Sequence, residues 1–171
     1  MSGYIGTKAV IANTASANLV TADFTVGTTL TVNGTSALTG NVTVTGTTTL
    51  NDDVTVAGVL KPTTYEETYV ANTTGATTTL NLATGTNFSV LLSENTTFVF
   101  SNPSATGTAF AFTLVITQPS SAKTITWPAS VDWPAAAAPD APGNSEVNAY
   151  GFVTRDGGTT YYGFLGGAAL G

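Results

Sequence analysis

The sequence predicts an all-β protein built from a short trimeric β-helix or β-prism shaft and a β-sandwich, jelly-roll-like head domain. Three observations lead to this prediction. Threonine, asparagine, serine and glycine make up 77 of the 171 residues, and threonine alone accounts for 36. Threonine favours strands over helices, whereas glycine and asparagine favour turns. The other two observations are a six-residue repeat in the first third of the chain and alternating apolar residues in the remainder.

The composition also restricts the chemistry of the protein. The chain has no histidine and no cysteine, which removes His-based catalysis, thiol nucleophiles and the usual zinc and iron–sulfur ligands. Its four basic residues are scattered among ten acidic ones, so no cluster is present to pair with phosphates. No apolar run reaches the roughly 18 residues of a membrane helix. We therefore expect no cofactor, no metal, no nucleic-acid partner and no membrane partner.

A break near Pro62 divides the chain. Fourteen of the sixteen aromatic residues lie at Tyr65 or beyond, and all seven prolines lie at Pro62 or beyond. Proline cannot donate a ladder hydrogen bond, so Pro62 is expected to end the repeat region. The sequence thus predicts an anchoring arm at residues 1–16, a shaft at 17–62 and a head at 63–171.

A period of six residues runs through the predicted shaft. The segment LTVNG at 30–34 recurs as VTVTG at 42–46 and VTVAG at 54–58, with half-repeats in between. The fifth position of each hexad is usually glycine, and the third is always aliphatic. These aliphatic residues are Val26, Val32, Leu38, Val44, Leu50 and Val56.

Each hexad is expected to form a short strand and a bend. Side chains alternate along a strand, so the aliphatics of a hexad turn inward together, and glycine suits the corner. A single-chain left-handed β-helix would need three hexads per coil, and two coils are too few for a stable stack. Three chains wound together would close a shared core with a shorter run. We therefore favour a homotrimer with these aliphatics as its core, over a single-chain coil or a threonine-rich linker.

The head shows the alternation of half-buried strands. Candidate strands lie at residues 65–70, 78–82, 88–92, 97–101 and 160–165. Further apolar residues at alternate positions are expected to share strand faces: Phe110, Phe112, Leu114 and Ile116; Ile125 and Trp127; Tyr150 and Phe152. Strands at this spacing are typical of a sandwich or jelly roll. The uncharged tail from Tyr161 onward is expected to pack against another subunit.

Aromatic residues near loops are the candidate binding residues. Trp133 stands between Asp132 and Pro134 at the start of the loop at 134–142, which predicts a surface position, and Tyr161 and Tyr162 could also stack on sugar rings. Trp127 alternates with Ile125 and is expected in the core. For the arm, the candidate anchoring residues are Tyr4, Ile5, Val10 and Ile11.

The sequence contains two carboxylate pairs and one serine–lysine pair that are candidate chemical sites. Glu66 and Glu67 are neighbours on a predicted strand and would point to opposite faces, so they make a poor catalytic pair. A turn explains the segment SSAK at 120–123 better than a Ser–Lys dyad does. Asp52 and Asp53 replace one glycine corner and could hold Ca²⁺ in a trimer, but a charged corner is the simpler interpretation. We expect no catalytic residues.

Several segments resemble bacteriophage fibre proteins. The head carries NTTFVFSNP at 95–103, TITWPASV at 124–131 and DGGTTYYGF at 156–164, which are similar to C-terminal domains of tail fibres and other virion proteins. The opening GYIG at 3–6 resembles the start of many such proteins. The resemblance implies a homotrimeric, non-enzymatic virion component with an anchor, a shaft and a distal domain. From the residues themselves, we expect the apolar arm to dock to other virion proteins, and the aromatic residues of the head make a host-surface glycan its candidate ligand. A cell-surface adhesin or carbohydrate-binding module is the alternative.

Overall fold

The computed structural model describes residues 29, 31, 33–52 and 54–170. The chain divides into two units, residues 1–57 and 58–171, with the division a few residues ahead of Pro62. The described residues form nine β-strands, one short 3-10 turn and no α-helix, so the predicted all-β class is confirmed. Val26, Val32 and the anchoring candidates Tyr4, Ile5, Val10 and Ile11 lie outside the described residues.

The described part of the first unit bends at regular intervals. Bends fall at Gly34, Gly40, Gly46 and Asp52, which are six residues apart and occupy the fifth position of successive hexads. This is the spacing that the sequence predicts for the corners. The described residues of this unit form no strand, so the β-helix shaft stays a prediction.

The aliphatic residues of the described hexads are exposed in the single chain. The exposed fractions of Leu38, Val44, Leu50 and Val56 lie between 47% and 71%. Valine and leucine gain about 1.5–3 kcal/mol each when they are fully buried. One chain therefore leaves most of this stabilisation unrealised.

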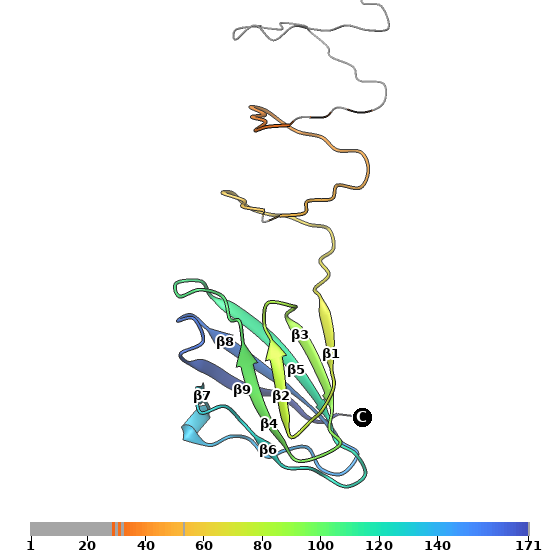
Figure 1. Ribbon diagram of the computed structural model, residues 1–171, viewed down its shortest axis with the longest axis vertical. Helices are drawn as coiled ribbons and strands as arrows, with labels where there is room; N and C mark the ends of the chain where they lie inside the picture. Colours follow the sequence, from red (N-terminus) through yellow and green to blue (C-terminus); the bar gives the residue numbers. More distant parts are fainter. Residues whose placement is uncertain (1–28, 30, 32, 53, 171) are drawn as a thin grey trace, which may run out of the picture. The chain divides into compact units, whose positions relative to one another are not determined.

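The second unit contains two β-sheets. The larger has the strand order β1-β3-β5-β8-β9-β7 and the smaller the order β2-β4-β6 (Figure 1). The strands are β1 (Tyr69–Asn72), β2 (Thr77–Asn81), β3 (Asn87–Leu91), β4 (Thr96–Ser101), β5 (Phe110–Thr117), β6 (Ile125–Thr126), β7 (Val131–Asp132), β8 (Val147–Thr154) and β9 (Tyr161–Leu170).

The first six strands alternate between the two sheets. The chain places β1, β3 and β5 in the larger sheet and β2, β4 and β6 in the smaller one, and each neighbouring pair is parallel. The chain thus winds in successive coils, each with one strand per sheet, before β8 and β9 pair antiparallel. The jelly-roll part of the prediction is wrong, because jelly rolls pair antiparallel strands. Apolar alternation reports which strand face is buried, but not the direction of the neighbouring strand.

The hydrophobic core lies between the two sheets. Leu80 and Phe98 of the smaller sheet and Phe88, Leu114 and Phe152 of the larger one are almost fully buried and belong to one cluster. Within β5 the predicted alternation is confirmed: Phe112, Leu114 and Ile116 are buried, whereas Ala111 and Thr113 are exposed. The exposed residues of β5 therefore form part of an outer sheet face.

Candidate functional site

Trp133 lies inside the head, so its prediction as a surface residue is wrong. Its side chain is only 7% exposed, and its ring centroid lies 5.2 Å from that of Trp127 and 5.6 Å from that of Phe152. A glycine explains this position: a Cβ atom on Gly163 would lie 2.8 Å from the Trp133 ring. The bare backbone of β9 leaves space for the indole. Trp127 packs against the core as predicted, stacked 5.3 Å from Phe98.

The two tyrosines of β9 have different environments. Tyr161 is 2% exposed and its ring lies 5.0 Å from that of Phe100, so its prediction as a surface binding residue is also wrong. Burial, followed by the negative charge of Asp156, raises the pKa of Tyr161. Tyr162 is 44% exposed, and the guanidinium of Arg155 lies 5.6 Å from its ring centroid. Because side chains alternate along a strand, these neighbours face opposite sides of the sheet.

A hollow of about 300 Å³ borders Tyr162, Trp133 and Pro134. The indole contributes little surface to it because Trp133 is buried. Asp132 is the only charged residue among the described ones that line it. The following loop at 134–142 is mostly exposed. Of the three predicted binding residues, only Tyr162 is exposed.

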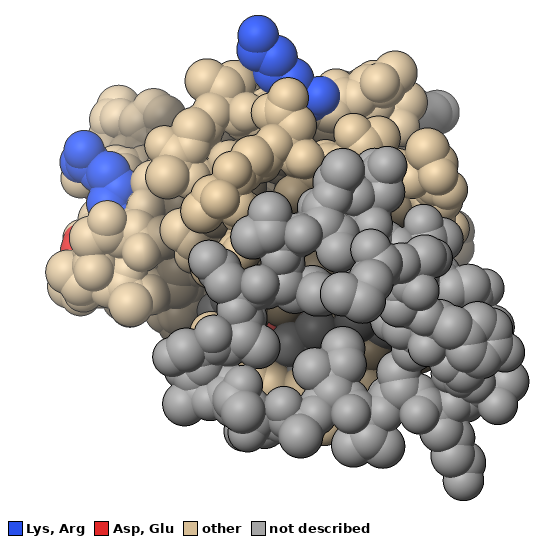
Figure 2. Space-filling view, turned by 90° about the horizontal axis from the view of Figure 1, so that it is seen from above, with Lys and Arg blue, Asp and Glu red and all other residues tan. Residues whose placement is uncertain are grey.

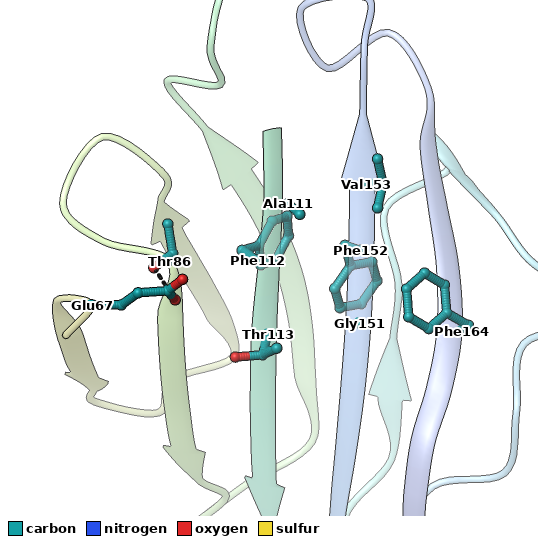
Figure 3. A pocket seen from close by; sticks show the side chains of 9 residues that line it. All are labelled: Glu67, Thr86, Ala111, Phe112, Thr113, Gly151, Phe152, Val153 and Phe164. Atoms are coloured by element: carbon teal, nitrogen blue, oxygen red, sulfur yellow. Dashed lines mark hydrogen bonds between the residues drawn. The ribbon is translucent and has the colours of Figure 1, made fainter. Parts of the chain in front are cut away.

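A second hollow, of about 200 Å³, lies on the outer face of the six-stranded sheet. Figure 3 shows Glu67 and Thr86 on one side, Phe164 on the other, and strands β5 and β8 between them. Ala111, Phe112, Thr113, Gly151, Phe152 and Val153 complete the lining. We call it the outer-sheet hollow. The sequence does not display this arrangement, because the hollow combines five segments that only the sheet pairing brings together.

The position of Phe164 depends on the glycine opposite it. Gly151 and Phe164 are register partners in the β8–β9 pair, and a Cβ atom on Gly151 would lie 2.3 Å from Cε2 of Phe164. The ring therefore lies over the bare backbone of β8. Phe164 nevertheless stays 46% exposed, so part of the aromatic surface faces solvent.

Hydrogen bonds hold the polar side of the outer-sheet hollow. Thr86 Oγ1 donates to Glu67 Oε2 at 2.7 Å, and the side-chain amide of Asn87 donates to the same oxygen. Thr113 Oγ1 donates to Asn87 Oδ1 at 2.5 Å. The hydrogen bonds from Thr86 and then Tyr65 lower the pKa of Glu67; desolvation opposes them, and the hydrogen bond from Asn87 lowers the pKa by a smaller amount. The carboxylate is therefore ionised at neutral pH.

We expect the Glu67 carboxyl to titrate below its ordinary value of 4.5. Since its pKa is lowered in the folded state, its contribution to stability is complete above 4.5 and is lost as the pH falls through the folded pKa. A carboxyl-detected NMR titration should show the low midpoint. Thr86→Ala should move the midpoint back towards 4.5, because it removes the largest cause. An unchanged midpoint in Thr86→Ala would show that another interaction sets the pKa.

The other candidate clusters have structural explanations. The segment at 120–123 is a turn in which the side-chain amide of Gln118 donates to the Lys123 carbonyl at 2.8 Å and accepts from the Lys123 amide at 2.9 Å. In the part of the chain that the structure describes, no three histidine, cysteine, aspartate or glutamate side chains gather as metal ligands. Asp53 lies outside the described residues.

Few charged side chains lie on the described part of the face drawn in Figure 2. The basic side chains, shown in blue, stand apart from one another among uncharged atoms. Among the described residues, no helix has the length and apolar character needed to cross a membrane.

Comparison with models of protein families, with curated proteins and with solved structures gave no match.

Proposed function

We propose that this protein is a structural component of a phage virion, a homotrimeric fibre or decoration protein whose head can contact the host surface. One observation carries the trimer: the aliphatics of the hexads are exposed in the single chain, while the backbone bends every six residues. Apolar residues that are exposed at a regular spacing are buried when they pack against a matching surface. Identical chains carry the same repeat and can therefore provide that surface for one another. The resemblance of the head and of the opening GYIG to fibre proteins supports the virion as the location.

The residues of the head favour binding over catalysis. Among the described residues, the outer-sheet hollow has one carboxylate in its lining; in another hollow, which Asp140 and Glu146 line, Glu146 is held in a turn by the Gly143 amide, which donates to Oε2 at 2.8 Å. A glycosidase of the common type needs two carboxyl groups on either side of the bond that it breaks. We therefore propose a protein without enzymatic activity. The alternative is a cell-surface adhesin or carbohydrate-binding module, which would also use a ligand-binding hollow on the head.

Removal of the arm tests the proposed function. The full chain should have a mass near three times 17.3 kDa by light scattering, and a chain that lacks residues 1–16 should remain a trimer. We propose that the arm docks to another virion protein by adding a strand or filling a groove, so the shortened trimer should be missing from purified particles. Incorporation at the normal level would contradict the anchoring role, and absence of the full chain from particles would contradict the virion assignment.

A further inference from the structure

We propose that the outer-sheet hollow binds one sugar ring of a glycan that carries no negative charge, with Phe164 as the stacking surface and Glu67 as the hydrogen-bond acceptor. The inference rests on the proposed contact of the head with a host surface. It places that contact on the outer face of the six-stranded sheet, at a hollow that shares Phe164 with the one bordered by Tyr162 and Pro134. Five segments of the head contribute to the hollow: the chain ahead of β1, the chain ahead of β3, and the strands β5, β8 and β9.

The apolar side of the hollow suits the C–H face of a pyranose. Phe164 is partly exposed while its ring lies over Gly151, so an aromatic surface remains accessible beside a floor without bulky side chains. Ala111 and Gly151 contribute the small residues of that floor. Ligand sites in proteins usually combine such apolar surface with a few placed polar groups.

The polar side supplies the acceptor that sugar hydroxyls need. A carboxylate has roughly four acceptor positions; Thr86 and Asn87 donate to Glu67 Oε2, and Tyr65 also hydrogen-bonds the carboxylate. Acceptor capacity is therefore left for a ligand hydroxyl. The side-chain amide of Asn87 donates a hydrogen bond to Glu67 through Nδ2 and accepts one from Thr113 at Oδ1. This side of the hollow is therefore ordered before a ligand binds. Such preorganisation reduces the entropy that binding costs.

Charge and size restrict the ligand further. Among the described residues, Glu67 is the only charged one in the lining, and its negative charge disfavours acidic sugars such as uronic or sialic acids. The volume of about 200 Å³ is smaller than the ~300–1,000 Å³ of pockets that enclose drug-sized molecules. One ring fits, and the affinity of one site should be on the order of millimolar. Three sites in a trimer would raise the avidity for a repeating surface glycan.

Saturation-transfer NMR on the full chain tests the site. The probes are the methyl glycosides of glucose, galactose and mannose, together with N-acetylglucosamine and glucuronic acid. At least one neutral sugar should receive saturation on its C–H protons, and glucuronic acid should receive less. Phe164→Leu and Glu67→Gln should each weaken binding about tenfold. Leucine keeps an apolar side chain over Gly151, and circular dichroism checks that both variants remain folded.

Two matched controls place the ligand. Tyr162→Ala removes an aromatic of similar exposure from the same strand and face, and Glu66→Gln removes the charge of the neighbouring carboxylate. Neither residue lines the outer-sheet hollow, so both variants should bind like the wild-type chain. An equal loss in Tyr162→Ala would overturn the assignment to this hollow.

Other outcomes also overturn the proposal. The absence of saturation transfer to every sugar would do so. Unchanged binding in Phe164→Leu and Glu67→Gln would place the sugar elsewhere. A trimer that joins particles but binds no sugar would leave the virion role standing. Sugar binding by a protein absent from particles would favour the adhesin or carbohydrate-binding module.

Discussion

Val44→Asp should dissociate the trimer and leave a chain with a mass near 17.3 kDa. Val44 occupies the third position of a hexad and is 58% exposed in the single chain. In the proposed trimer, three such residues meet in an apolar core. The variant would bring three unpaired carboxylates together there, and the burial of unpaired charge is strongly unfavourable. Light scattering at several protein concentrations measures the change.

Thr43→Asp is the matched control for this substitution. Thr43 precedes Val44 in the same hexad, and alternation along a strand would point its side chain away from the core. The control introduces the same charge and should remain a trimer. A wild-type chain that is a soluble, folded monomer would contradict the intertwined shaft, as would a Val44→Asp variant that remains trimeric.

Trp133→Ala should lower the free energy of unfolding of the head by about 3–5 kcal/mol. The indole is buried against Trp127, Tyr150 and Phe152, so its removal leaves a cavity that these rings cannot close fully. Urea denaturation of the full chain, followed by near-UV circular dichroism, measures the loss.

Tyr162→Ala provides the comparison for a surface aromatic. Tyr162 is 44% exposed and the Arg155 guanidinium lies beside its ring, so its removal should lower the free energy of unfolding by only about 0.5–1 kcal/mol. Both variants should still bind sugar in the outer-sheet hollow under conditions in which the head remains folded. A loss below about 1 kcal/mol for Trp133→Ala would contradict its place in the core.

The sequence alone determined the fold class and the local periods. A threonine-rich, glycine-punctuated chain favours strands, and the described residues form strands without an α-helix. The six-residue period located the bends from Gly34 to Asp52. Alternation identified Phe112, Leu114 and Ile116 as the buried face of β5. These features follow from spacing within one segment, which a sequence displays directly.

Only the tertiary structure decided the pairing of the strands and what the pairing brings together. The parallel winding of the first six strands, the burial of Trp133 over Gly163 and the position of Phe164 over Gly151 all depend on which strands are neighbours and in what register. The outer-sheet hollow exists for the same reason, since Glu67 and Phe164 are nearly a hundred residues apart in the chain. Alternation within a segment determines which face of a strand is buried. The residue that lies opposite a glycine is decided only when the sheet assembles, and so is the aromatic ring that packs over that glycine.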